Sequence, residues 1–187
     1  MRVVALDLDD TLLRSDGTIS PRTVDLLRAW RAAGHYVVIA TGRPPRNIAE
    51  ALPDDFHQVP WITYNGALVF EDGVKIYENL MSVEDTRQIV SLVQDSLPSC
   101  TLGLEIDDIL YLNQAAKRPV AYQLANLIEI ASAPSAKVLF WHNDFAALDP
   151  LLSGLPAGAR ALLSDKYSLV QILAASADKA EALRFVV

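Results

Sequence analysis

Apolar residues in the first part of the chain fall into short runs that alternate with helix-like segments. The expected elements are strands at 3–8, 35–40 and 61–64, helices at 21–33 and 44–52, and a hairpin formed by 67–70 and 74–77. The first two strands are apolar on both faces, which is typical of strands buried in a parallel sheet. Ser20 suits the N-cap of the first helix and Pro21 its first position. This alternation predicts a doubly wound, mainly parallel α/β sheet that binds its ligand at the carboxyl ends of the strands.

The pattern changes at about residue 82, where helices and hairpins begin to follow one another. The expected elements are helices at 83–96, 121–130 and 145–152 and strands at 101–106, 109–113, 137–141, 160–163 and 169–173. Two helix-and-hairpin units with antiparallel character indicate an α+β domain inserted into the first domain. The sequence therefore predicts one domain formed by residues 1–79 and 178–187, and a second domain formed by residues 80–177.

Composition says more about where in the cell the protein is found than about its fold. No apolar run reaches the roughly 18 residues of a membrane span, and Asp7 lies too close to the start for a secretory signal. The single cysteine, Cys100, has no partner for an internal disulfide, which fits a reducing compartment, and we expect it in the core. We therefore expect a cytoplasmic protein with no membrane partner.

The charge balance argues against nucleic acid as a partner. The chain has 16 basic and 23 acidic residues, a net charge of −7, and no basic run longer than a pair. Nucleic-acid binding depends on clustered Lys and Arg side chains, which this chain lacks. The same negative field repels phosphorylated metabolites weakly, so a phosphate site would have to be made positive locally.

Two carboxylates stand at the end of the first expected strand. Asp7 and Asp9 are two positions apart and so share one face of an extended segment, and Thr11 follows them. One acid could attack a substrate while the other handles a proton, or both could approach one divalent cation. The alternative is that the two acids simply begin a solvated loop. Because a loop needs neither this spacing nor Thr11, the pattern favours a functional site.

Polar residues also follow the second and third expected strands, at the same edge of the sheet. The Thr41 hydroxyl and the Gly42 amide precede a helix that begins with proline, where a helix amino-terminus offers donors to an anion. The alternative for Thr41 is a plain helix N-cap. Arg43 could contact the substrate or pair with an acid. Asn65 is a substrate-side candidate, although Asn-Gly is also a common turn dipeptide.

These motifs together resemble those of a known family. Asp7-x-Asp9-x-Thr11 after an apolar strand is similar to the first motif of the haloacid dehalogenase-like superfamily. In order and spacing, the later segments resemble its Cof-type branch, namely residues 17–20, 38–43 and 64–67 and a lone Lys179. The resemblance implies a core with an inserted type IIB cap at residues 80–177, which covers the active site. It also implies a phosphatase that acts on small phosphorylated metabolites, such as sugar phosphates.

The resemblance also implies a role for each site residue. Asp7 would be the nucleophile that forms an aspartyl-phosphate, and Asp9 would protonate the leaving alcohol and then deprotonate water. Lys179 would be a cation that bridges Asp7 and the phosphate, whereas without the resemblance it reads as a surface lysine. The cofactor would be Mg²⁺, bound by Asp7 and by the carbonyl oxygen of Asp9.

One element of the resembled pattern is missing. The family's fourth motif, an acidic loop that completes the magnesium shell, should follow Lys179, yet the sequence stops at Val187. Two other functions therefore stand beside a phosphatase, namely a phosphate-binding or interaction module without turnover and a phosphotransferase. In the resembled fold the strand at 3–8 would become an open edge. We expect the chain to self-associate through this edge, to aggregate, or to have the edge covered by further sequence. We also expect weak phosphatase activity with a high magnesium requirement.

Overall fold

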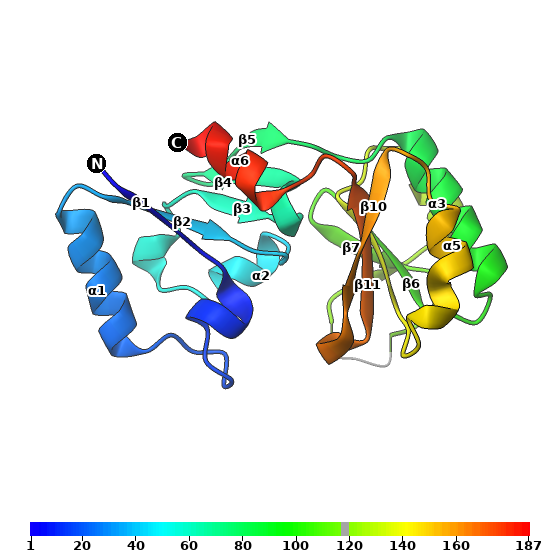
Figure 1. Ribbon diagram of the computed structural model, residues 1–187, viewed down its shortest axis with the longest axis horizontal. Coiled ribbons are helices and arrows are strands. Elements are labelled where there is room, and N and C mark those ends of the chain that lie inside the picture. Colours follow the sequence, from blue (N-terminus) through cyan, green and yellow to red (C-terminus); the bar gives the residue numbers. More distant parts are fainter. Residues whose placement is uncertain (117–119) are drawn as a thin grey trace. The chain divides into compact units, whose positions relative to one another are not determined.

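The structure is a computed structural model that describes residues 1–116 and 120–187. It divides into two compact units, each with its own sheet (Figure 1). The first unit comprises Met1–Asn79 and Ala177–Val187, and the second comprises Leu80–Ser176. None of the helices in the described residues has the length and apolar character needed to cross a membrane.

The first unit contains a five-stranded sheet in the order β1-β2-β3-β4-β5. Its strands are β1 (Val3–Leu6), β2 (Tyr36–Ala40), β3 (Trp61–Thr63), β4 (Leu68–Glu71) and β5 (Val74–Glu78). The pairs β1·β2 and β2·β3 are parallel, whereas β3·β4 and β4·β5 are antiparallel. The α/β class expected from the sequence is confirmed. The carboxyl ends of β1, β2 and β3 share one edge of this sheet, as in any parallel set.

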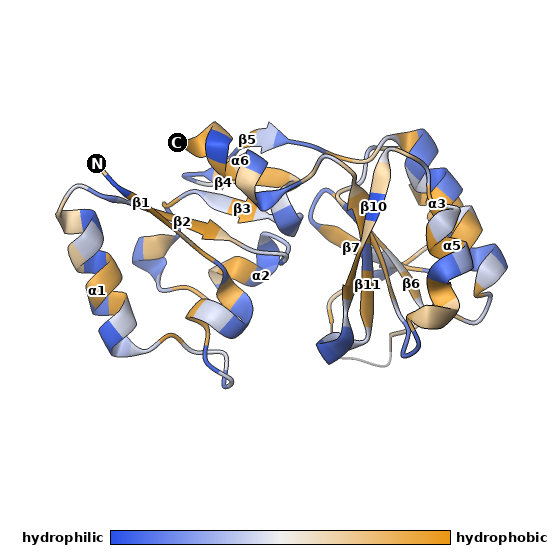
Figure 2. Cartoon of the chain, viewed as in Figure 1, coloured by the Kyte–Doolittle hydropathy of each residue, from blue (hydrophilic) through white to orange (hydrophobic). Residues whose placement is uncertain are grey.

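Helices cover both faces of this sheet. They are α1 (Pro21–Ala32), α2 (Arg46–Ala49) and α6 (Lys179–Val186). The connections in this unit also contain three short turns, η1 (Leu8–Leu12), η2 (Asp54–Phe56) and η3 (Tyr64–Gly66). Val37 and Ile39 of β2 pack in the core cluster with α1, whereas Val38 and Ala40 pack with Ala182 of α6. Figure 2 shows hydrophobic residues along β1 and β2 and residues of both kinds along α1. The alternation within β2 therefore anchors α6 on one face and α1 on the other.

Local capping explains where α1 begins. The Ser20 hydroxyl accepts a hydrogen bond from the backbone N–H of Thr23 at 3.0 Å, and Pro21 occupies the first helical position, as expected. The helix ends at Ala32 with Ala33 as its C-cap, and Gly34 follows with a φ of +78° that suits glycine. These two signals explain why the predicted bounds of this helix, 21–33, agree with the observed bounds to within one residue.

Two expectations for the first unit were wrong. The first strand ends at Leu6, and it is not buried on both faces, because Val3 and Ala5 are exposed. In the described part of the chain, β1 hydrogen-bonds only to β2, so its outer side lacks a neighbour. The helix expected at 44–52 is confined to the four residues of α2, because proline bounds this segment at Pro45 and again at Pro53.

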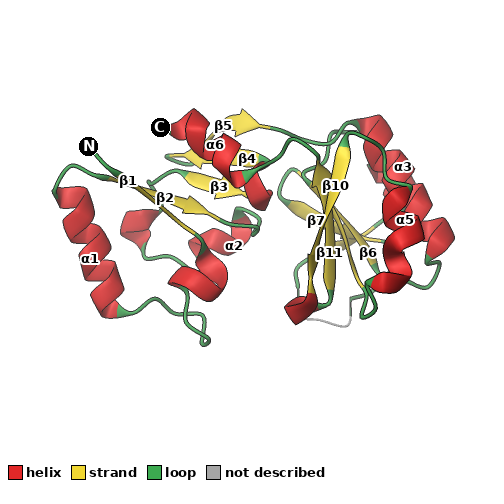
Figure 3. Cartoon of the chain, in the orientation of Figure 1, coloured by secondary structure: helices red, strands yellow, loops and turns green. Residues whose placement is uncertain are grey.

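The second unit contains a six-stranded sheet in the order β10-β11-β9-β6-β7-β8. Its strands are β6 (Leu102–Ile106), β7 (Ile109–Leu112), β8 (Gln123–Leu124), β9 (Lys137–Trp141), β10 (Ala159–Ser164) and β11 (Leu169–Ala174). Its helices are α3 (Val83–Ser96), α4 (Leu127–Ile130) and α5 (Asp149–Ser153). Two short turns complete the unit: η4 (Ala146–Leu148) precedes α5, and η5 (Asp165–Tyr167) precedes β11. Helix α3 contacts β6, β9 and α5. Figure 3 shows α3 beside α5. All pairs are antiparallel except β7·β8.

The sequence predicted most of this unit but misread one segment. The bounds of α3 and β9 agree with prediction, and Asp107 and Asp108 form the expected hairpin turn with φ of +50° and +61°. The helix expected at 121–130 was wrong in its first half, where Gln123 pairs with Tyr111 in β8. A helix begins only at Leu127, because the Asn126 side chain caps it there.

Candidate active site

The Asp7 carboxylate lies between two donors of the first unit. Its Oδ1 accepts a hydrogen bond from the Leu8 N–H at 2.8 Å, and its Oδ2 accepts one from Nζ of Lys179 at 2.8 Å. Lys179 is the first residue of α6, whose N-cap is Asp178. Oδ1 of Asp178 accepts from the Ala180 N–H at 2.8 Å. The cap therefore sets the start of α6 and, with it, the position of the lysine beside Asp7.

Asp9 lies in η1 at a point where the backbone leaves the helical region, with φ of −72° and ψ of 131°. Both of its carboxylate oxygens accept hydrogen bonds from Arg43, one from Nε at 2.9 Å and one from Nη2 at 2.7 Å. Of the two expectations for Arg43, the structure shows the ion pair with an acid. Two carboxylates and two cations thus stand together at the ends of β1 and β2.

Thr41 is fully buried and holds the loop after β2. Its carbonyl accepts from the Asn65 N–H at 3.0 Å, and its hydroxyl accepts from the Arg43 N–H at 3.2 Å. The alternative that Thr41 is a plain helix N-cap was wrong, because α2 begins at Arg46 and its N-cap residue is Pro45. The expected helix amino-terminus at Thr41 and Gly42 is absent for the same reason. The donors here belong to a loop.

Gly42 and Asn65 meet across this loop. A Cβ atom at position 42 would lie 3.0 Å from both Oδ1 and Nδ2 of Asn65, which is tighter than ordinary contact. Asn65 itself has φ of +57°, a conformation that Asn tolerates better than most residues. The structure therefore brings together all seven residues expected at the site, namely Asp7, Asp9, Thr41, Gly42, Arg43, Asn65 and Lys179, within the first unit.

Gly66 is a structural residue of the site that the sequence reading treated only as part of a turn. Its φ is +102°, and a Cβ atom there would lie 2.3 Å from the backbone carbonyl atoms of Asp178. Only glycine lets η3 approach the start of α6 this closely. The Asn-Gly dipeptide after a buried strand was the available signal, but nothing local in the sequence names Asp178 as its neighbour.

Oxygen donors for a hard cation are few at this site. In the described residues, no group of three or more His, Cys, Asp or Glu side chains could hold a metal ion. Both carboxylate oxygens of Asp9 accept from Arg43, and Oδ2 of Asp7 accepts from Lys179, which leaves Oδ1 of Asp7 as the carboxylate donor. The backbone carbonyl of Asp9 is the second donor that the motif resemblance implies. Magnesium is commonly bound through one or two carboxylates with phosphate and water completing the shell. The donor set fits magnesium in that restricted sense.

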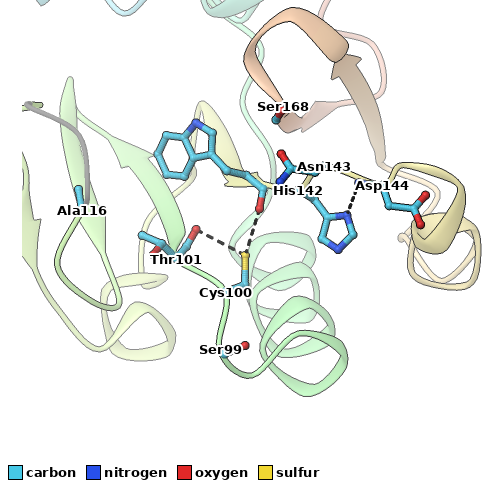
Figure 4. A pocket seen from close by; sticks show the side chains of 9 residues that line it. Ser99, Cys100, Thr101, Ala116, His142, Asn143, Asp144 and Ser168 are labelled. Carbon is cyan, nitrogen blue, oxygen red and sulfur yellow. Dashed lines mark hydrogen bonds between the residues drawn. The ribbon is translucent and has the colours of Figure 1, made fainter.

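A separate cavity of about 550 Å³ lies in the second unit (Figure 4). Its lining residues are Ser99, Cys100, Thr101, Ala116, Trp141, His142, Asn143, Asp144 and Ser168. Cys100 is half-buried there and not in the core as expected, and burial raises the pKa of its thiol. Oδ1 of Asp144 accepts a hydrogen bond from the Ala147 N–H at 3.3 Å. None of the residues expected at the active site lines this cavity.

Comparison with known proteins identifies the family. A family model described as haloacid dehalogenase-like hydrolase matches residues 4–187, nearly the whole chain. The chain belongs to the haloacid dehalogenase-like hydrolases. It is 32% identical over 112 residues to the 5-amino-6-(5-phospho-D-ribitylamino)uracil phosphatase YitU of Bacillus subtilis (strain 168). That alignment covers 58% of this chain and 42% of YitU, so the chain spans less than half of this relative's length.

Solved structures of other proteins share the fold. The chain is 26% identical to TM0651 from Thermotoga maritima, with a TM-score of 0.80 and coverage of 99% of this chain and 73% of that one. It is 17% identical to the sugar phosphatase BT4131 of HAD subclass IIB, with a TM-score of 0.83 and coverage of 100% and 75%. At 17% identity the second likeness concerns the fold alone. The family expected from the motifs is confirmed, and both structures share the fold of this chain.

Proposed function

We propose that this hydrolase is a phosphatase that cleaves phosphate monoesters of small metabolites through an aspartyl-phosphate on Asp7. The observation that carries the proposal is the 2.8 Å contact between Nζ of Lys179 and Oδ2 of Asp7, beside a second carboxylate and the Thr41 loop. A phosphoryl group is anionic and repels nucleophiles, so a catalyst has to neutralise charge and hold the nucleophile in line. Lys179 supplies positive charge at the atom that would attack.

The reaction has two steps in this proposal. In the first, a carboxylate oxygen of Asp7 forms a bond to phosphorus while the bond from phosphorus to the ester oxygen breaks. Asp9 gives a proton to the leaving alcohol. In the second step, Asp9 takes a proton from water, the water oxygen bonds to phosphorus, and the bond to Asp7 breaks. The products are the free alcohol and inorganic phosphate, and both carboxyl groups return to their starting states.

The loop residues would bind the transferred phosphoryl group. The Gly42 amide and the Asn65 side chain lie at the same sheet edge as Asp7, and the close approach at Gly42 keeps Asn65 over the loop. The buried Thr41 hydroxyl stabilises this loop through its bond from the Arg43 N–H at 3.2 Å, and we assign it to the phosphate side as well.

Magnesium would be held by the Asp7 carboxylate and the Asp9 backbone carbonyl, the two hard donors identified above. When bound, it neutralises the charge of the phosphoryl group. Without it, Lys179 remains as the cation on Asp7. Because this chain contributes few donors, we propose a high magnesium requirement and weak turnover.

The second unit, Leu80–Ser176, would act as the cap that selects the leaving group. One relative supports the class of substrate: YitU is named a phosphatase of a phosphoribitylamino-uracil. That name describes a small phosphorylated metabolite with a polar alcohol as the leaving group. We propose the same class for this chain.

Turnover measurements test the proposal. Phosphate release from p-nitrophenyl phosphate and from a panel of sugar phosphates should depend on added Mg²⁺ and fall to background with EDTA. Asp7→Asn should abolish release while the circular dichroism spectrum stays the same. Asp25→Asn, an exposed acid on α1, is the matched control and should leave release unchanged. Phosphate binding without any release by the wild type, or release by Asp7→Asn above a few per cent of the wild-type rate, would refute the assignment.

A further inference from the structure

The link between Arg43 and Asp9 is a fork in which two nitrogens meet two oxygens. Nε lies 2.9 Å from Oδ2, and Nη2 lies 2.7 Å from Oδ1. Paired contacts of this kind define both the position and the plane of a carboxylate, whereas a single contact leaves it free to rotate. Asp9 therefore has one orientation for as long as Arg43 is present.

Arg43 is itself held by the protein on several sides. Its N–H donates to the Thr41 hydroxyl at 3.2 Å, and its carbonyl accepts from the Tyr64 N–H at 3.1 Å. The third guanidinium nitrogen, Nη1, donates to the Asn47 carbonyl at 3.2 Å. The arginine is thus fixed to the loops after β2 and β3, and each of its side-chain nitrogens already donates to a protein oxygen.

The backbone around Asp9 is irregular. η1 is interrupted at Asp9, and the next residue, Asp10, has φ of +60°. A helix would set the direction of the Asp9 side chain through its own geometry, but an interrupted turn does so only weakly. The tertiary contact with Arg43 therefore contributes most to where the Asp9 carboxylate points.

We propose that Arg43 is the positioning residue of Asp9 and that it is not a ligand of the phosphoryl group. This inference rests on the proposed function, in which Asp9 exchanges protons with the leaving alcohol and with water. A general acid acts within about 2.6–3.2 Å of its target oxygen, and a displacement of about 1 Å can cost roughly 10²-fold in rate. Arg43 holds Asp9 within that tolerance.

The leaving group of the substrate separates positioning from phosphate binding. p-Nitrophenolate leaves without a proton, whereas an alkyl alcohol needs one from the general acid. If Arg43 positions the acid, its removal lowers kcat/KM for alkyl phosphates far more than kcat/KM for p-nitrophenyl phosphate. If Arg43 binds the phosphoryl group, its removal lowers kcat/KM equally for both esters, because the phosphoryl group is the same in each.

The experiment compares kcat and KM of four proteins on p-nitrophenyl phosphate and on the sugar phosphate that the wild type hydrolyses fastest. Arg43→Ala should lower kcat/KM for the sugar phosphate by about 10²-fold, and for the aryl ester by less than about threefold. Asp9→Asn should show the same dependence on the leaving group. Arg43→Lys keeps the charge without the fork and should behave like Arg43→Ala. Equal losses on both esters, or full rescue by lysine, would overturn the proposal.

A matched control exists within the same unit. Arg28 makes an equivalent fork to Asp55, with Nε 2.8 Å from Oδ2 and Nη2 2.9 Å from Oδ1. Arg28→Ala removes a bidentate pair of the same geometry from the α1 side of the unit. It should leave kcat/KM unchanged on both esters, so a general effect of losing a surface arginine is separable from the loss of Arg43.

Crystal structures provide a second readout that needs no turnover. In Arg43→Ala, the Asp9 carboxylate should leave its wild-type position while Lys179 stays beside Asp7. A wild type that hydrolyses neither ester would contradict the proposed function, and the crystal structures would still decide the positioning role. An Asp9 side chain that keeps its place without Arg43 would overturn that role.

Discussion

The Nζ atom of Lys179 and the Oδ2 atom of Asp7 lie 2.8 Å apart, although 172 residues separate them along the chain. Both side chains are partly exposed, at 31% and 43%. An exposed pair of this kind adds little to stability, and its presence at the site is better explained by chemistry. This reasoning leads to the first prediction.

Replacing Lys179 with methionine should reduce kcat/KM for any phosphate ester by about 10²- to 10³-fold, because one fixed cation near the developing charge is lost. The melting temperature should change little. Lys75→Met is the control, since Lys75 pairs with Glu78 on exposed β5. Steady-state phosphate release measures both variants. A Lys179→Met variant with wild-type turnover would exclude the lysine from catalysis.

The second prediction concerns the contact between η3 and α6. Gly66→Ala should destabilise the protein by more than about 2 kcal/mol, because the new methyl group would overlap the Asp178 backbone. Gly73→Ala is the matched control: its φ of +75° is also positive, but open space surrounds it. Gly73→Ala should lower the free energy of unfolding only by the conformational strain, about 1 kcal/mol. Urea unfolding measures both, and equal losses would show that the Asp178 contact is unimportant.

The third prediction concerns Cys100. Burial raises the pKa of its thiol, so at pH 8 less of it is thiolate than in free cysteine. Alkylation by iodoacetamide should therefore be slower than for free cysteine and should recover on unfolding. The neutral thiol is favoured in the folded state. Its contribution to stability is thus present below the ordinary pKa of about 8.5 and is lost as the pH rises above it. An alkylation rate equal to that of free cysteine at pH 8 would contradict this.

The fourth prediction concerns the outer side of β1. Val3 is 36% exposed, and in the part of the chain that the structure describes β1 pairs with β2 alone. An unpaired strand edge is a template for another strand. We expect two copies of this chain to associate through β1, which sedimentation would detect as a concentration-dependent dimer. Val3→Lys should weaken that dimer, whereas Val74→Lys on the opposite edge strand should not. A monomer at every concentration would refute this expectation.

The residues of the site could be predicted because they stand where strands end. Asp7, Thr41 and Asn65 follow three different strands, and parallel strands deliver their carboxyl ends to one edge whatever the details of the loops. Lys179 was accessible only through resemblance, since a lysine at the start of a helix is usually a surface residue. Its neighbour Asp178 is the N-cap of α6, a position that Asp favours, and this local feature sets where the helix starts.

The errors arose where a distant partner decides the local structure. Gln123 has no strong strand preference, and it lies in β8 only because Tyr111 of β7 offers a ladder. The fork from Arg43 to Asp9 joins residues 34 positions apart, so the sequence left both roles of the arginine open. The helix after Pro45 was overestimated because its apolar period continues to Leu52, although its hydrogen-bonded turns end sooner.

The first unit is built from two separate stretches of chain, whereas the second is one continuous stretch. A ribosome delivers Leu80–Ser176 in full before it delivers α6, so the second unit can fold on the nascent chain while the first is still open. During that interval Val38 of β2 lacks Ala182, its neighbour from α6, and Asp7 lacks Lys179. A folded second unit also brings the two stretches of the first closer together, which lowers the entropy lost in joining them. The contact between Asp7 and Lys179 therefore forms only after the second unit has been synthesised, and a nascent chain that still lacks α6 has Asp7 without its lysine partner.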